Sequence, residues 1–230
     1  NKQQHYISVI AVNCLGSLYL LSDGNTEINS ISDLEGKTIT TSVATSTTVP
    51  ILRYLLEKNH VNAEIKVEAD HAALVTKIVK NEVSLAVLPE PMVTTALTKN
   101  ASYSVDLNLS EEWDSVSDKP LAMGCMVVRQ DYLENHKAKV DSFLEEYKSS
   151  VAYIGNSENL TSAVQMIVDA GIIPAAPVAT SALKNLYGSL VCIDGADMQA
   201  TLEAFYTVLK DAMPTSIGGK LPDESFYYKK

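Results

Sequence analysis

Residues 36–57, GKTITTSVATSTTVPILRYLLE, decide the fold, because a strand, a turn and a helix follow one another there. The β-branched residues at 37–41 favour the strand. Three hydroxyl residues ahead of Pro50 are candidates for the helix N-cap: Ser46, Thr47 and Thr48. Such a turn directs free backbone N–H groups toward the place where α/β sheets hold ligands. We interpret it as a binding loop for an anionic or polar group, with an ordinary capped helix start as the alternative.

Length and composition indicate a globular protein. The 230 residues, 46% of them hydrophobic, can bury a core as one large domain or two small ones. No run of about 18 apolar residues occurs, so we expect no membrane span. The net charge of −10 argues against nucleic acid or an anionic membrane surface as partner. Cys14, Cys125 and Cys192 are expected to be buried free thiols, with a Cys14–Cys125 bridge as the alternative.

Beyond the binding loop, short strands alternate with helical patterns. We expect strands at 63–69 and 83–88, an edge strand at 103–107, and helices at 71–80 and 92–99. This alternation predicts βαβ units and a mainly parallel sheet. Two apolar stretches interrupted by small residues, 6–21 and 120–129, bracket the block. We interpret each as one long buried strand and the two together as a hinge between lobes.

The rest of the chain is predicted to be helical. Apolar residues at helical spacing indicate helices at 131–136, 139–154, 157–170, 178–186 and 194–212. The fold class is therefore α/β, with two lobes. We place residues 1–18 and 126–230 in the first lobe and residues 19–125 in the second.

Glu90, in the segment VLPEPM, is the sharpest candidate for a functional side chain. It follows a buried strand, lies between two prolines and precedes a helix. A carboxylate there would point into a cleft and accept hydrogen bonds from a cationic or N–H-bearing ligand. The alternative is a simple cap for the next helix. Trp113 would either line the cleft or cover the core.

Motifs for catalysis or metal binding are weak. The serines lack a G-x-S-x-G elbow, and no cysteine–histidine arrangement is recognisable. His60 and His71, with nearby carboxylates, lack the spacing of a metal site, so we assign them to solvated surface. We therefore predict no catalytic residue, no metal and no cofactor.

Five segments in order carry a resemblance to a known family. They are DLEGKTI, TVPILRYLLEK, KNEVSLAVLPEPMVTTAL, EEWDSVSDKPLAMGCMVVRQDYLENH and SIGGKLPDESFYY. Together they resemble the substrate-binding proteins of ABC importers, of the nitrate/sulfonate/taurine and thiamine-precursor (NMT1/THI5-like, SsuA-like) type. The resemblance implies a type II periplasmic-binding-protein fold, in which two α/β lobes joined by two hinge strands close on a ligand.

The resemblance also assigns ligand-binding residues. By position, the binding turn contains Ser42, Ser46, Thr47 and Thr48, and Glu90 stands at the cleft-facing strand end. Asn13 and Gly16 would line the first crossing between the lobes, and Met123 and Gly124 the second. Ala44 and Thr45 depart from the glycine-rich turn of many relatives, which weakens the case for a close backbone grip on sulfonate or nitrate.

The implied function is an extracytoplasmic solute-binding receptor. It would be periplasmic, or tethered to the membrane as a lipoprotein, and would deliver a small organic solute to an ABC permease. Two alternatives share the fold: the effector domain of a LysR-type regulator, and an enzyme of pyrimidine synthesis, which would need a histidine in the cleft. No good histidine candidate is evident in the sequence.

The start of the sequence departs from the family pattern. Family members begin with a βαβαβ unit, which is not recognisable here, so we expect the first lobe to be incomplete. Residues 6–12 would then form an unpaired sheet edge. We therefore predict self-association of the chain.

Overall fold

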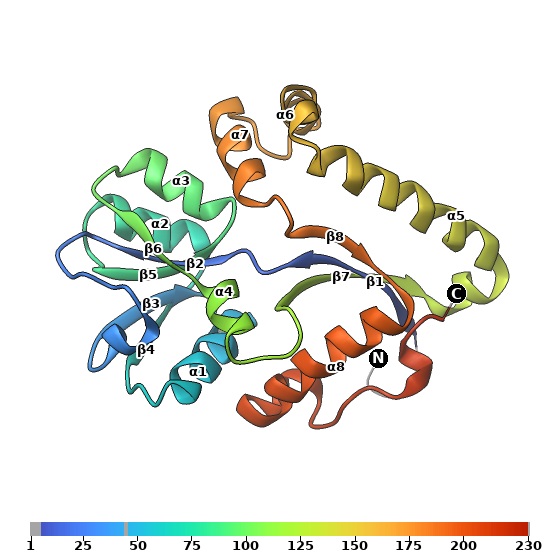
Figure 1. Ribbon diagram of the computed structural model, residues 1–230, viewed down its shortest axis with the longest axis horizontal. Coiled ribbons are helices and arrows are strands. Elements are labelled where there is room, and N and C mark those ends of the chain that lie inside the picture. Colours follow the sequence, from blue (N-terminus) through green and yellow to red (C-terminus); the bar gives the residue numbers. More distant parts are fainter. Residues whose placement is uncertain (1–5, 44–45, 230) are drawn as a thin grey trace.

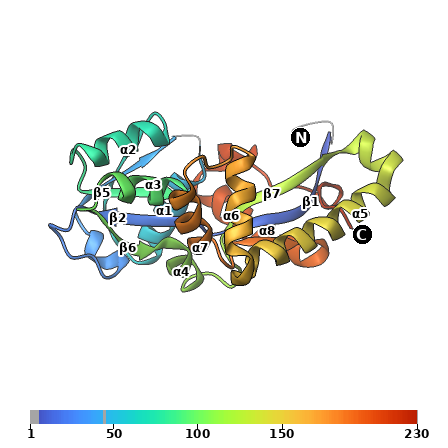
Figure 2. The same cartoon turned by 90° about the horizontal axis from the view of Figure 1, so that it is seen from above.

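The computed structural model describes residues 6–43 and 46–229, so the predicted turn at Ala44 and Thr45 lies outside the described residues. Figure 1 shows two α/β halves side by side, each built around its own sheet. Two paths of chain join the halves: β1 (Ile7–Leu15) runs on into β2 (Leu18–Ser22) along the long axis in Figure 2, and the chain returns from α4 (Leu109–Asp114) to β7 (Ala122–Arg129). The α/β fold with two such halves agrees with the predicted fold class.

The half that contains most of residues 19–125, the second lobe of the prediction, is called the first half here. It holds a five-stranded sheet. Its strands in spatial order are β4 (Glu64–Glu68), β3 (Thr38–Ser42), β5 (Leu85–Pro89), β2 (Leu18–Ser22) and β6 (Ser104–Asn108). Its helices are η1 (Ile31–Leu34), α1 (Thr48–Lys58), α2 (His71–Val79), α3 (Met92–Lys99) and α4 (Leu109–Asp114). In Figure 1, α2 and α3 lie on one side of this sheet and α1 on the other.

The sheet is mixed, so the prediction of a mainly parallel sheet is wrong. Strand β3 runs parallel to β4 and β5, but β2 runs antiparallel to β5 and to β6. The physical reason is that β2 enters directly from β1 in the other half, without a crossover helix to set its direction. Strand β6 lies at the sheet edge, as predicted.

The second half holds a three-stranded antiparallel sheet. Its strands in spatial order are β7 (Ala122–Arg129), β1 (Ile7–Leu15) and β8 (Leu190–Ile193). The helices are α5 (Gln130–Gly155), η2 (Ser157–Asn159), α6 (Leu160–Asp169), α7 (Ala176–Asn185), α8 (Gly195–Ala212), η3 (Pro214–Ile217) and η4 (Glu224–Phe226). Helices α5 and α8 cover opposite faces of this sheet (Figure 1).

Three expectations about this half are corrected. The stretch 6–21 is two strands rather than one, because the chain changes sheets at Gly16 and Ser17. Strand β8 was not predicted, since four half-buried residues are too short a signal. Because β8 pairs with β1, β1 is the central strand and not an unpaired edge, and β7 and β8 are the edges instead.

The main hydrophobic cluster joins both sheets through α1, α4 and α8. Trp113 in α4 is fully buried within it, and its Nε1 donates to the Lys119 carbonyl at 2.8 Å. Trp113 therefore belongs to the core, which decides between the two alternatives for this residue.

None of the three cysteines forms a disulfide, as expected, but their burial differs from the prediction. Cys14 and Cys192 are half-buried, whereas Cys125 is exposed because it lies on the edge strand β7. Within the described residues, no helix is both long and apolar enough to cross a bilayer.

Candidate functional site

The candidate site lies where the two halves meet. Strands β3 and β5 are parallel neighbours, with Thr40 opposite Ala86, so Ser42 and Glu90 emerge at the same sheet edge. The connection from β1 to β2 passes this edge, because the Glu90 N–H donates to the Ser17 carbonyl at 3.0 Å. We call this region the junction.

Glu90 is the central side chain of the junction and is only 8% exposed. Its Oε1 accepts hydrogen bonds from Thr94 Oγ1 at 3.0 Å and from Asn185 Nδ2 at 2.6 Å. The Thr94 backbone N–H, in the first turn of α3, donates to Oε2 at 3.3 Å. Glu90 therefore caps α3, which was the alternative considered for it, and it also bonds to the other half of the molecule.

The segment after α7 supplies junction residues that sequence reasoning missed. Asn185 is the last residue of α7, and its carbonyl accepts from Tyr19 Oη at 3.2 Å. Ser189 Oγ donates to the Gly16 carbonyl at 2.7 Å, and the Leu15 N–H donates to the Ser189 carbonyl at 2.8 Å. These residues are remote from the hinge in sequence, and no local pattern marks them.

Gly16 is buried at the crossing, where α4 approaches it closely. A Cβ at this position would lie 1.9 Å from Ser110 Oγ and 2.4 Å from Ser110 Cβ. Glycine is therefore required here by the close approach of α4 to the backbone. The predicted crossing residue Gly16 shapes the junction through its lack of a side chain.

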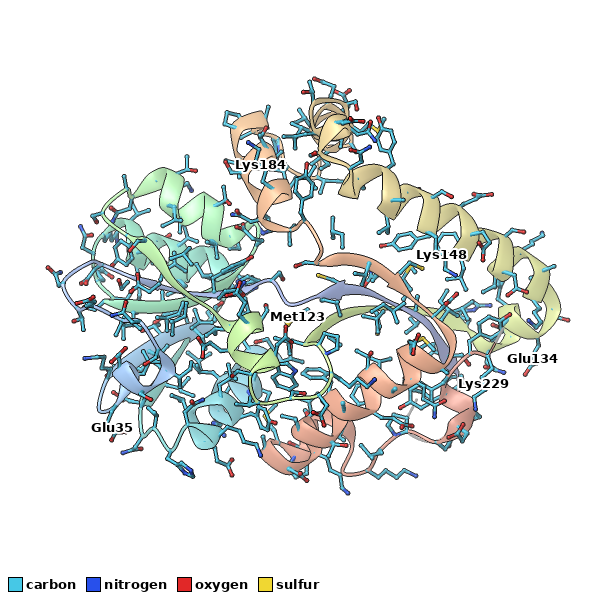
Figure 3. All side chains as sticks on the ribbon, in the orientation of Figure 1. Glu35, Met123, Glu134, Lys148, Lys184 and Lys229 are labelled. Atoms are coloured by element: carbon cyan, nitrogen blue, oxygen red, sulfur yellow. The ribbon has the colours of Figure 1, made fainter. Side chains whose placement is uncertain are left out.

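Asn13 and Gly124 face each other across β1 and β7. A Cβ on Gly124 would lie 2.6 Å from Asn13 Oδ1. That oxygen is buried and accepts no hydrogen bond from the described residues. Burial raises the pKa of Tyr147 on α5, and a hydrogen bond with Asn13 opposes that rise. Met123 instead packs, half-buried, against the main hydrophobic cluster, and Figure 3 shows it beside α4 and β7.

The predicted binding turn is organised by Ser46 rather than by Thr47. Ser46 Oγ donates to the Ser42 carbonyl at 3.3 Å and accepts from the Thr48 N–H at 3.4 Å. Thr47 occupies the N-cap position of α1 with helical dihedral angles and makes no side-chain cap. Thr48 is the first helical residue and is only 4% exposed. The expected capping by Thr47 is therefore wrong, because the chain is already helical there.

His71 lies at the same edge, which corrects its assignment to solvated surface. It is the first residue of α2, and its Nδ1 lies 2.5 Å from Ser42 Oγ. His71 is half-buried and Ser42 is 1% exposed. The Asp70 carboxylate caps α2 by accepting from the Ala73 N–H at 2.7 Å, and this cap holds His71 over the end of β3.

The junction is rich in acceptors and carries negative charge. Among the described residues joined by these contacts, Glu90 and Asp70 are the carboxylates, and no lysine or arginine takes part. The negative charge affects Tyr19. Burial raises the pKa of its hydroxyl, and the charges of Glu90, Glu111 and Cys14 raise that pKa further. Such a site is suited to ligands that donate hydrogen bonds or carry positive charge.

The structure brings the predicted residues together in three groups. Ser42 and Ser46 form one, Glu90 with the Gly16–Ser17 crossing forms another, and Asn13 with Gly124 forms the third. No hydrogen bond in the described ranges links one group to another. In residues 6–43 and 46–229, no cluster of His, Cys, Asp and Glu side chains is suited to hold a metal ion.

Comparison with known proteins gives one family match. The profile of the family described as NMT1/THI5 like matches residues 7–158. No curated protein matches the chain.

Several solved structures share the fold. An ABC transporter protein from Parabacteroides distasonis is 18% identical with a TM-score of 0.77, over 98% of this chain and 75% of that one. The periplasmic aliphatic sulphonate binding protein from Escherichia coli is 15% identical with a TM-score of 0.67, over 87% of this chain and 64% of that one. The periplasmic nitrate-binding protein from Synechocystis is 12% identical with a TM-score of 0.58, over 84% and 53%.

Proposed function

The chain belongs to the NMT1/THI5-like family, and on this premise we propose that it is the solute-binding receptor of an ABC importer. It binds a small organic solute between its halves and passes it to a permease in the membrane, without catalysing a reaction. It works outside the cytoplasm, in the periplasm or tethered to the membrane as a lipoprotein. The similarity in fold to periplasmic binding proteins supports this proposal.

One observation carries the proposal: the 2.6 Å hydrogen bond from Asn185 Nδ2 to Glu90 Oε1. It joins a buried carboxylate of the first half to an exposed side chain of the second. A receptor that closes on its ligand needs polar groups of both halves to meet at one place. A solute with an N–H group can replace Asn185 as a donor to Glu90, so ligand binding and the relative position of the halves are coupled.

The solute belongs to the sulfonate, nitrate or thiamine-precursor classes of the family, and the charges at the junction favour one kind. Glu90 accepts from N–H or cationic groups, whereas Ser42, Ser46 and Thr48 flank the start of α1, whose dipole favours an acidic or polar group. A solute that carries both kinds of group satisfies both ends. Asn13 Oδ1 offers one further acceptor.

A thermal-shift screen tests the proposal with sulfonates, nitrate, pyrimidines, amino acids and polyamines. A solute at about 100 times its Kd stabilises the protein by about 2.7 kcal/mol, a shift that is easily measured. We expect Glu90→Gln and Ser46→Ala to reduce this shift, and Glu57→Gln, an exposed carboxylate on α1, to leave it unchanged. No shift from any class, or equal shifts in all variants, would contradict a receptor that binds at the junction.

The contact between Ser42 and His71 favours a second candidate, an enzyme of pyrimidine synthesis with the same fold. A histidine beside a hydroxyl at the ligand edge can exchange a proton with a bound substrate. Mass spectrometry after incubation with pyrimidines separates the two functions. A receptor returns its ligand unchanged, whereas an enzyme consumes it and loses that activity in His71→Gln.

A further inference from the structure

One face of the β3–β4 pair is polar where a helix-covered sheet is usually apolar. The parallel register places Thr38 and Thr40 of β3 on the same face as Lys66 and Glu68 of β4. The opposite face carries Ile39, which is fully buried in the main hydrophobic cluster. The polar face therefore lies outside the main hydrophobic cluster, beside the edge strand β4.

A cavity of about 510 Å³ opens on this face, a size that accommodates a small metabolite. Its polar lining includes Thr40, the lysines Lys37, Lys66 and Lys77, and the glutamates Glu68 and Glu82. None of the lining residues takes part in the junction contacts. The cavity is therefore lined by other residues of the first half, and it extends along β3 and β4 from Lys37 to Glu68, the register partner of Ser42.

The three lysines of the lining differ in their carboxylate partners. Lys77 Nζ pairs with Glu68 at 2.6 Å, and Lys66 Nζ lies 3.6 Å from Glu64. Lys37 has no salt bridge within the described ranges, although its charge helps to lower the pKa of the Asp33 carboxyl. With Glu64 beside Lys66, three ammonium groups face three carboxylates, and Lys37 is the lysine of the lining that has no salt bridge in the described ranges.

Thr40 adds a hydroxyl that opens on the cavity. Its side chain lines the cavity and the residue is only 4% exposed, yet Thr40 Oγ1 has no hydrogen bond to any described residue. Its neighbour Thr41 shows the usual arrangement, since it is 1% exposed and its Oγ1 donates to the Val87 carbonyl at 3.2 Å. Thr40 Oγ1 is not one of the fully buried side-chain atoms that lack a partner, so it opens on the cavity, where a ligand oxygen can accept from it.

We propose that this cavity is a second binding site, which takes a small oxyanion with several acceptor oxygens, a phosphate or a carboxylate. Lys37 supplies the ammonium group that has no carboxylate partner, and the Thr40 hydroxyl donates to a ligand oxygen. The neighbouring ion pairs hold Lys66 and Lys77 in place at the wall. The site differs from the junction in charge and therefore in ligand.

Calorimetric titration with pyrophosphate and with malonate, at constant ionic strength, tests the proposal and separates phosphate from dicarboxylate. We expect saturable binding to one site, weakened about tenfold in Lys37→Gln through loss of one charge-assisted hydrogen bond. Lys184→Gln, an exposed lysine on α7 in the other half (Figure 3), should bind like the unchanged protein. Equal weakening in both variants would indicate only diffuse attraction and would overturn the proposal, as would no binding up to about 10 mM.

Thr40→Val and Thr41→Val provide a matched pair on opposite faces of β3. Without added anion, Thr41→Val should lower Tm because it loses a hydrogen bond, whereas Thr40→Val should keep or raise Tm. Thr40→Val should also weaken binding of the anion that titrates, and Thr41→Val should not. A fall in Tm for Thr40→Val as large as for Thr41→Val would show that the hydroxyl is structural, and would overturn its role as a ligand donor.

Discussion

Gly16→Ala should strongly destabilise the protein by pushing α4 away from the crossing between the halves. The new Cβ would lie 1.9 Å from Ser110 Oγ and 2.4 Å from Ser110 Cβ, against about 3.5–4.0 Å for ordinary carbon contacts. A rotation of the serine side chain moves Oγ but not Cβ, so the backbone has to shift. We expect a loss of about 3 kcal/mol, the upper end for an overpacked site.

Equilibrium urea unfolding measures this loss. Trp113 is the sole tryptophan of the sequence, it is fully buried, and it lies in α4, so its fluorescence reports on the helix that has to move. A loss of 3 kcal/mol is a large part of the roughly 5–15 kcal/mol that stabilises a typical domain. The midpoint should fall at an unchanged m-value if the unfolded state is unaffected.

A double-mutant cycle with Ser110→Gly provides the control. Ser110→Gly removes both clashing atoms and leaves the Ser110 Cα at 3.3 Å from the new Cβ. It also removes a buried hydroxyl that has no partner in the described residues, which offsets part of the cost of about 1 kcal/mol for glycine in a helix. Gly16→Ala should therefore cost much less in the Ser110→Gly background. Additive losses, or a loss below about 0.5 kcal/mol for Gly16→Ala alone, would refute the steric argument.

Two further predictions concern the second half. Burial, aided by the charge of Cys125, raises the pKa of Tyr206 from 10.0 to about 12 in the folded protein. Between about pH 10 and 12 the tyrosine therefore loses its proton in the unfolded state but keeps it in the folded state. The free energy of unfolding should fall over this range. Urea unfolding of Tyr206→Phe should show a weaker fall over this window, and equal slopes would contradict the shift. The edge strand β7 is uncharged from Ala122 to Val128, so we expect self-association that Val127→Lys, at a residue 48% exposed, reduces. Sedimentation at micromolar concentration checks this, and a monodisperse monomer before the substitution would count against it.

The sequence predicted most elements of the first half because their signals are local. Alternating β-branched residues mark β3, and the helix at 71–80 appears as α2 with the carboxylate of Asp70 as its cap. The position of Glu90 at the end of a strand was also predictable, because two prolines and a buried run define it. The family profile over residues 7–158 agrees with the resemblance in four of the five segments, whereas the fifth, SIGGKLPDESFYY at residues 216–228, lies outside the matched range.

The partners of these residues were not predictable, because they come from distant parts of the chain. Asn185, which bonds to Glu90, belongs to an exposed helix end with no motif. His71 was predicted to be a surface residue from the sequence, but in the fold its Nδ1 lies 2.5 Å from Ser42 Oγ at the end of β3. Single-residue patterns report burial and conformation, but they do not report which distant side chain will be adjacent.

The sequence by itself determined the α/β class, most of the helices and strands, and the family, since periodicity and short-range side-chain contacts encode these features. The short helix α4 was not predicted. Only the tertiary structure decided the antiparallel direction of β2, the pairing of β8 with β1, and the cavity beside Thr40. These depend on how the two sheets pack against each other, and the free energy of that packing is spread over contacts between residues far apart in sequence.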